Sequence, residues 1–162
     1  MKNDIFKIAL SVLLVISCML IILRFSLQEG EKSGEVSSNV IKDVLSAVIG
    51  EENVTEELVS NAQLPVRKMA HFGVYMLLGF TLMNLFNMLY SVNAYRIFFL
   101  FPPIIGVLYS VFDEHLIQKA TVGRAPSWID VLIDSTGVIF GICLYILLII
   151  TVKRLKNNKQ RT

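Results

Sequence analysis

Three ionisable side chains, His71, Glu114 and Asp134, interrupt long apolar stretches of the sequence. An imidazole exchanges a proton near neutral pH, and a neighbouring carboxylate can orient it or hold a metal ion. A charged group near the centre of a membrane helix costs about 3 kcal/mol, so such residues mark functional sites by default. We therefore treat these three as candidate catalytic residues. The spacing of the ligand-type residues matches no metal or cofactor motif, so neither a metal ion nor a cofactor is expected.

Polar and cationic side chains near these three are candidates for binding a substrate. The planar guanidinium of arginine suits a phosphate or a carboxylate. Steps of four residues place Tyr75 on the helix face of His71 and Gln118 on that of Glu114. The substrate-binding candidates are Arg67, Lys68, Tyr75, Gln118, Arg124 and Asp130.

Several of these residues also have structural explanations. Glu114 could pair with Arg124 and lock the helices together, and Asp130 with Ser127 fits a capping box at a helix start. Asp113, next to Glu114, is expected to point elsewhere on a helix of 3.6 residues per turn and is a weaker candidate.

The composition requires a membrane to solvate the chain. Of the 162 residues, 54% are hydrophobic and 17% are charged, against about 25% charged in a soluble domain. The net charge of +2 is spread along the chain without a sustained basic face, which argues against nucleic acid as a partner. The two cysteines, Cys18 and Cys143, lie in apolar stretches and argue against a disulfide-stapled secreted domain.

Four segments approach the 20 or so apolar residues that cross a bilayer: 5–25, 68–90, 96–116 and 128–152. Backbone groups in lipid must be paired within the segment, and no alternating barrel pattern is visible, so we predict an all-α bundle of four spans. We read the first segment as a retained span, because its apolar stretch is long for a signal peptide and no A-x-A cleavage site follows it. The whole chain, 1–162, is expected to form a single membrane domain.

The positive-inside rule predicts that both termini are cytoplasmic. Lys2 and Lys7 precede the first span, Arg96 lies between the second and third, and the tail 153–162 is strongly basic. Basic residues on the other side of the membrane argue against this orientation, namely Arg67, Lys68, Lys119 and Arg124. The predicted orientation therefore depends mainly on the basic tail.

The acidic insert 28–66 would then face outward, and its apolar spacing predicts two short amphipathic helices on the membrane surface or over the bundle. The insert could act as a lid over a site or as a connector, and we favour the connector. Pro102 and Pro103 predict a kink near the middle of the third span, and Gly137 with Gly141 predicts a close helix contact.

The three candidate catalytic residues agree in side and depth. His71 follows the start of span two, Glu114 precedes the end of span three, and Asp134 follows the start of span four. If the helices of spans two and four start near Pro65 and Trp128, His71 and Asp134 lie at the same depth. Because helices alternate in direction, all three side chains fall towards one membrane face, and we predict a shared polar pocket.

An ordered set of short motifs resembles the VanZ-like family of membrane proteins, which is linked to teicoplanin resistance. The motifs are R-K-x-x-H-F-x-x-Y-x-x-L-G at 67–79, D-E-x-x-x-Q at 113–118, G-R at 123–124 and D-V-x-x-D-x-x-G-x-x-x-G at 130–141. Asp134 stands where many members have asparagine. The resemblance implies a protein of the bacterial cytoplasmic membrane, and it implies no established reaction.

Three functions compete on these residues. We favour a protein that binds an outer-leaflet anionic lipid or lipid-linked envelope precursor and so alters sensitivity to a lipophilic glycopeptide. The alternative is a membrane-embedded enzyme for such a substrate, acting through His71 and Glu114. His71 would be the general acid or base, and Glu114 or Asp134 would orient it or hold a metal. A small transporter is disfavoured because no inverted repeat is visible. The sequence leaves the oligomeric state open.

Overall fold

The computed structural model describes residues 2–93 and 96–160, which form five α-helices joined by short turns and loops. Four helical segments are long and apolar enough to cross a membrane: Asp4–Ser26, Glu56–Ser91, Arg96–Gln118 and Trp128–Lys159. The predicted all-helical fold with four candidate spans is therefore confirmed. Arg161, part of the basic tail used for orientation, lies outside the described residues.

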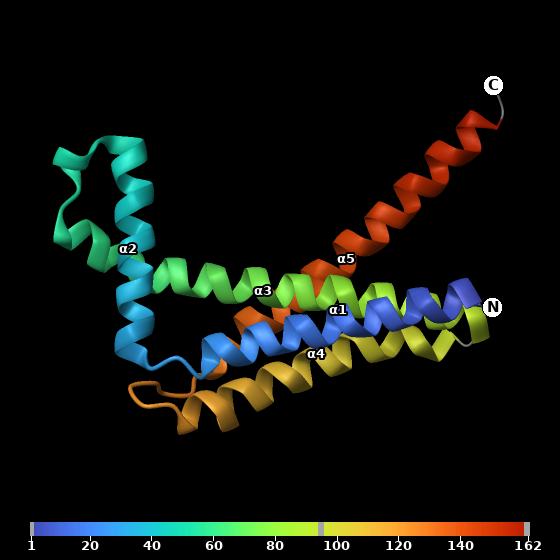
Figure 1. Ribbon diagram of the computed structural model, residues 1–162, viewed down its shortest axis with the longest axis horizontal. Coiled ribbons are helices and arrows are strands. Elements are labelled where there is room, and N and C mark those ends of the chain that lie inside the picture. Colours follow the sequence, from blue (N-terminus) through green and yellow to red (C-terminus); the bar gives the residue numbers. More distant parts are fainter. Residues whose placement is uncertain (1, 94–95, 161–162) are drawn as a thin grey trace.

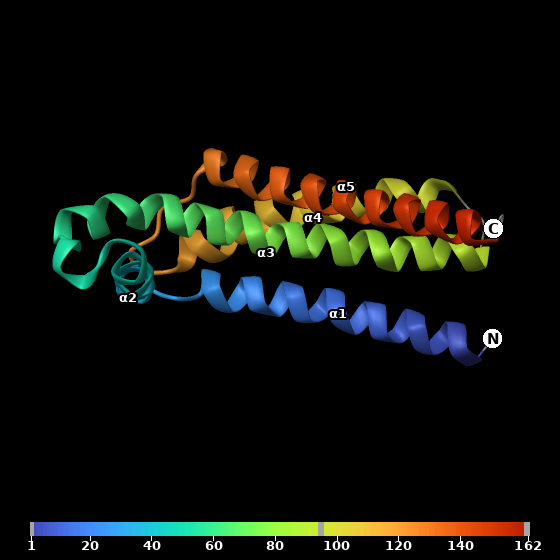
Figure 2. The same ribbon diagram turned by 90° about the horizontal axis from the view of Figure 1, so that it is seen from above.

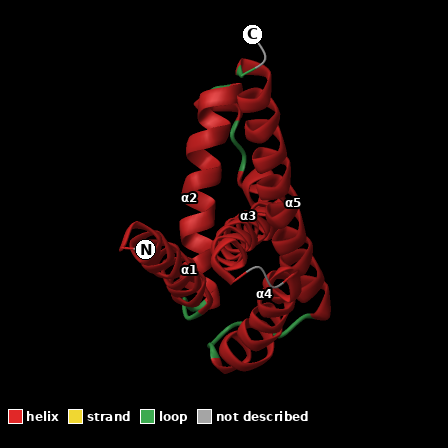
Figure 3. Ribbon diagram, turned by 90° about the vertical axis from the view of Figure 1, so that its right-hand side faces the viewer, coloured by secondary structure: helices red, strands yellow, loops and turns green. Residues whose placement is uncertain are grey.

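The first three long segments run side by side, whereas the fourth crosses them obliquely and its C-terminal half points away from the bundle (Figure 1). The four segments comprise α1 (Lys2–Ser26), α3 (Glu56–Asn93), the third span ending in α4 (Phe101–Phe112) and a further turn, and α5 (Trp128–Lys159). Seen along the bundle, α3 lies in the middle, with α1 on one side and α4 and α5 on the other (Figure 3). The described ends of the chain lie at the same end of the bundle (Figure 1), which fits an even number of spans.

The first part of the insert forms α2 (Gly30–Ile49), which lies across one end of the bundle, transverse to α1 and α3 (Figures 1 and 2). Ile41 is buried against the rest of the protein, whereas Val40, Val44 and Val48 are exposed. This arrangement confirms the first amphipathic helix. A helix that lies across the membrane normal with an exposed apolar face is suited to the interface.

The second insert helix is not separate, because α3 begins at Glu56 and continues through Pro65 into the second span. The expected start near Pro65 is therefore wrong. Proline removes one backbone hydrogen bond, but the turns before it are held against α2. Val59 is only 4% exposed, and Gln63 donates a hydrogen bond to the hydroxyl of Ser38.

The prolines of the third span stand at a helix start. A 3-10 turn, η2 (Arg96–Leu100), precedes α4, and Pro102 and Pro103 occupy the first turn of α4. The N–H groups of a first turn have no intrahelical partner, so proline is tolerated there at little cost. The prediction that these prolines kink the middle of a continuous helix is therefore wrong. Instead, the third span changes from a 3-10 helix to an α-helix just before them.

Glycines set the close contact between α3 and α5. A Cβ atom added to Gly141 would lie 1.9 Å from the carbonyl oxygen of Met76, and one added to Gly137 would lie 2.6 Å from that of Phe72. On the α3 side, a Cβ at Gly79 would lie 2.1 Å from the carbonyl oxygen of Val138. The predicted packing role of the G-x-x-x-G pair is confirmed. This contact packs the middle of α3 closely against α5.

Candidate functional site

A π-helical turn, η3 (Asp113–Gln118), ends the third span and turns three polar side chains inward. Hydrogen bonds in a π-helix join residues five apart, so Asp113 and Gln118 share a face. The amide of Gln118 donates to Asp113 Oδ2 at 3.3 Å and to Glu114 Oε2. All three side chains are at most 4% exposed. The expectation that Asp113 points away is wrong, because it assumed an α-helical period.

Glu114 has a complete set of protein partners. Its Oε2 accepts from Gln118, as the four-residue step predicts, and its Oε1 accepts from the backbone N–H of Ser127 at 2.9 Å. Ser127 is the N-cap of α5 but makes no side-chain capping bond, so the predicted capping box with Asp130 is wrong. Glu114 thereby joins the end of the third span to the start of the fourth. The direct pairing of Glu114 with Arg124 is replaced by a link through Gln118.

Arg124 ties four segments of the chain together. Its guanidinium donates to the carbonyl oxygens of Phe25 (2.9 Å) and Gln28 (3.0 Å) and to the side chains of Gln118 (2.7 Å) and Ser33 (3.3 Å). Burial lowers the pKa of Arg124, and the nearby positive charge of Arg67 lowers it further. Arginine remains charged at neutral pH in spite of this. Its contacts give Arg124 a structural task in addition to the predicted binding role.

Two contacts between a basic and an acidic side chain connect α3 with α5 in the described part of the chain. Lys68 Nζ lies 2.8 Å from Asp130 Oδ1, and His71 Nδ1 lies 3.7 Å from Asp134 Oδ1. The Lys68–Asp130 pair is partly exposed, with side-chain exposures of 32% and 25%, whereas Asp134 is 0% exposed. His71 therefore faces a buried carboxylate of α5, and the Glu114 carboxylate is engaged elsewhere.

His71, Asp113 and Asp134 form the most compact group in this region. One ligand-type atom from each lies within 4.8 Å of the others. Tyr75, one turn along α3 from His71, is 0% exposed, and its hydroxyl has no hydrogen-bond partner among the described residues. The group lies where the second, third and fourth spans meet, beside Ser26 at the end of α1.

The candidate catalytic residues share one cavity, as their matched positions predict. A small polar cavity is lined by all three together with most of the binding candidates: Arg67, Lys68, His71, Glu114, Gln118, Asp130 and Asp134. Tyr75 lies behind this cavity in the core, and Arg124 lies outside its lining.

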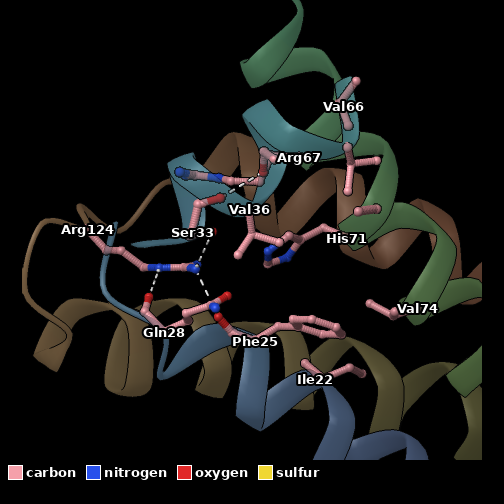
Figure 4. A pocket seen from close by; sticks show the side chains of 13 residues that line it. Ile22, Phe25, Gln28, Ser33, Val36, Val66, Arg67, His71, Val74 and Arg124 are labelled. Carbon is pink, nitrogen blue, oxygen red and sulfur yellow. Dashed lines mark hydrogen bonds between the residues drawn. The ribbon is translucent and has the colours of Figure 1, made fainter. Parts of the chain in front are cut away.

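A second cavity, of about 200 Å³, opens beside the first between α1, α2 and α3 (Figure 4). Its walls are mainly apolar, with contributions from Ile22, Phe25, Val36, Val40, Val66 and Val74. Arg67, His71 and Arg124 also line it, so the two cavities share Arg67 and His71. Among the described residues Arg67 has no hydrogen-bond or ion-pair partner. The site therefore combines an apolar chamber with a cationic rim and a buried polar cluster.

The site residues that sequence reasoning missed differ in how visible they are in the sequence. Asp113 is visible as a charged residue inside a span, and only the helical period excluded it. Ser26 donates to Asp113 Oδ2 at 2.7 Å, and Ser33 accepts from Arg124, but isolated serines carry no such signal in a sequence.

These features define a polytopic helical membrane protein with a polar cluster enclosed at one end of its spans. The VanZ/LLP1 family matches residues 11–150, so the chain belongs to this family. The match also covers the acidic insert and most of the first span, which carry none of the motifs described above. No curated protein and no solved structure matches the chain.

Proposed function

We propose that the protein binds an anionic lipid or a lipid-linked envelope precursor, with an acyl or prenyl chain in the apolar cavity and the charged headgroup at Arg67. The observation that carries the proposal is the lining of this cavity, in which two arginines face a chamber of valine, isoleucine and phenylalanine side chains (Figure 4). Ligand pockets of this kind combine an apolar wall with a few polar groups that fix orientation.

Arg67 is the group best suited to the headgroup. Lys68 is engaged with Asp130, and Arg124 uses its guanidinium for contacts within the protein. Arg67 lacks such contacts among the described residues and lies close enough to Arg124 for the two positive charges to repel. A phosphate or carboxylate between them would offset this repulsion and accept paired hydrogen bonds from Arg67.

The position of α2 supports the lid interpretation of the insert. Ser33, Val36, Ser37 and Val40 of α2 form one wall of the apolar cavity. In a bacterial cytoplasmic membrane with both termini inside, this end of the bundle would face the outer leaflet. Binding there would alter the exposure of envelope precursors and so the sensitivity of the cell to a lipophilic glycopeptide such as teicoplanin.

The test measures lipid binding by the purified protein in detergent, using native mass spectrometry with phosphatidylglycerol and phosphatidylcholine as probes. We expect the wild type to retain phosphatidylglycerol preferentially and Arg67→Gln to lose this preference. Lys119→Gln, which removes an exposed cation at the same end of the bundle, is the matched control and should bind as the wild type does. Equal retention of both lipids by the wild type would contradict the proposal.

An enzyme acting on the same class of substrate is the second candidate, and the His71–Asp134 pair at 3.7 Å favours it. In this case His71 would transfer a proton, and Asp134, one of the two carboxylates considered for this role, would orient its ring. His71→Gln keeps a hydrogen-bonding side chain but cannot exchange a proton near neutral pH. With variants at matched membrane levels, an enzyme predicts that His71→Gln is as damaging as His71→Ala in a drug-sensitivity assay. Lipid binding alone predicts a mild effect.

A further inference from the structure

Two buried aspartates carry oxygen atoms that accept no hydrogen bond from any described residue. Asp134 is 0% exposed, and among the described residues neither of its carboxylate oxygens has a hydrogen-bond partner. Asp113 is 1% exposed, and its Oδ1 is likewise unpaired. An ionised carboxylate without partners costs several kcal/mol when buried. Each of the two side chains is therefore stable there only when it is protonated, faces a counter-charge or contacts a bound group.

The neighbouring cations are engaged elsewhere. Lys68 pairs with Asp130, and Arg124 reaches Gln118 and backbone carbonyls. Arg67 lines the walls of both cavities, and no salt bridge joins it to either aspartate in the described part of the chain. Glu114, by contrast, has hydrogen-bond donors at both of its oxygens. Asp113 and Asp134, which face His71, thus keep oxygens without a hydrogen-bond partner, whereas Asp130 Oδ1 has the Lys68 ammonium beside it.

The geometry of this group suits a small cation. The three ligand-type atoms lie within 4.8 Å of one another, and His71 Nδ1 is 3.7 Å from Asp134 Oδ1. That separation is too long for a good hydrogen bond. Two ligand atoms on a tetrahedral ion with bonds of about 2.0–2.2 Å are about 3.4 Å apart. His71 Nδ1 and Asp134 Oδ1 would therefore need to approach each other by only a few tenths of an ångström to bind the same ion.

We propose that His71, Asp113 and Asp134 bind one divalent transition-metal ion, Zn²⁺ or Mn²⁺, inside the helix bundle. One imidazole nitrogen and two carboxylate oxygens are ligands that these ions accept, whereas Mg²⁺ and Ca²⁺ prefer oxygen alone. A doubly charged ion balances two aspartates facing a neutral histidine. Three protein ligands leave a further position for water or for a ligand headgroup.

The groups around the cluster support this assignment. Ser26 and Gln118 both donate to Asp113 Oδ2, which leaves the unpaired Oδ1 to face the ion. Such outer contacts orient metal ligands in proteins. The unpartnered hydroxyl of the buried Tyr75 can serve Asp113 or Asp134 in the same way. His71 and Asp113 are 42 residues apart, and Asp113 and Asp134 are 21 residues apart. Such wide spacing forms no recognisable metal motif in the sequence. The proposal does not depend on lipid binding.

The test measures metal content and thermal stability of the full-length protein in detergent. After treatment with a chelator, the protein is dialysed against Zn²⁺, Mn²⁺ or Mg²⁺, and bound metal is quantified by plasma mass spectrometry. We expect about one Zn²⁺ or Mn²⁺ per chain and a raised unfolding temperature, with no uptake of Mg²⁺. Asp113→Asn and Asp134→Asn should each weaken binding at least about tenfold.

Asp130→Asn is the matched control, because Asp130 lies one turn from Asp134 but pairs with Lys68. It should bind metal as the wild type does. The proposal is overturned if the wild type binds neither ion, or if Asp134→Asn binds as much as the wild type does. Should the asparagine variants fail to fold, the wild type decides the question, because unchanged stability on addition of Zn²⁺ and Mn²⁺ would also overturn the proposal.

Discussion

Gly141 of α5 lies so close to Met76 of α3 that an added Cβ would stand 1.9 Å from the Met76 carbonyl oxygen. This contact lies on the same helix pair as His71 and Asp134, and close packing there keeps the two side chains 3.7 Å apart. The bundle thus depends on glycine at the α3–α5 contact to assemble its polar cluster.

We therefore expect Gly141→Val to lower the free energy of unfolding by about 2 kcal/mol, because overpacked contacts force backbones apart. The measurement is thermal unfolding in detergent, followed by circular dichroism. Gly73→Ala is the control, because a Cβ at Gly73 meets nothing within 4 Å, and alanine favours a helix. Equal unfolding temperatures for Gly141→Val and the wild type would show that the close contact does not stabilise the protein.

Arg124→Lys should destabilise the protein by about 2 kcal/mol or more. Lysine keeps the charge but cannot reproduce four hydrogen bonds directed to α1, α2 and η3. The same unfolding assay measures the effect, with Lys119→Ala as an exposed control at the end of the helix before the loop of Arg124. If Arg124→Lys is as stable as the wild type but loses lipid binding, Arg124 serves the ligand and not the fold.

The hydrophobic pattern predicted most of the fold. Apolar segments of about 20 residues predicted the four candidate spans, and Gly137 with Gly141 predicted a close contact. The helix boundaries near prolines were not predicted correctly, because they depend on tertiary contacts and on local helix type. Pro65 is accommodated within α3, whose first turns pack against α2, and Pro102 stands at a helix start after a 3-10 turn.

The candidate site was also predicted only in part, because some of its contacts depend on tertiary structure. His71, Glu114 and Asp134 were placed at one end of the bundle from their positions in the spans, and they line one cavity. The inward position of Asp113, beside His71 and Asp134, was not predicted, because the π-turn that brings it there is not visible in the residue spacing. The apolar cavity also escaped prediction, since it forms only where α2 crosses α1 and α3.

The orientation in the membrane is tested with single cysteines, after Cys18 and Cys143 are replaced by serine. Asn39→Cys, on an exposed position of α2, should react with a membrane-impermeant thiol reagent added to intact cells. Asn158→Cys, on the exposed basic end of α5, should react only after the cells are lysed. Labelling of Asn158→Cys but not of Asn39→Cys in intact cells would show that the protein has the opposite orientation.

Lipid binding in the apolar cavity is tested most directly by photo-crosslinking in cells. A photoreactive phenylalanine analogue replaces Val74, which lines the cavity, or Leu77 of the same helix, which is 49% exposed and does not line it. We predict that the Val74 variant yields an adduct enriched in one anionic or lipid-linked species, whereas the Leu77 variant samples the bulk lipids. Identical adducts at the two positions, or none at Val74, would contradict a lipid site between α1, α2 and α3.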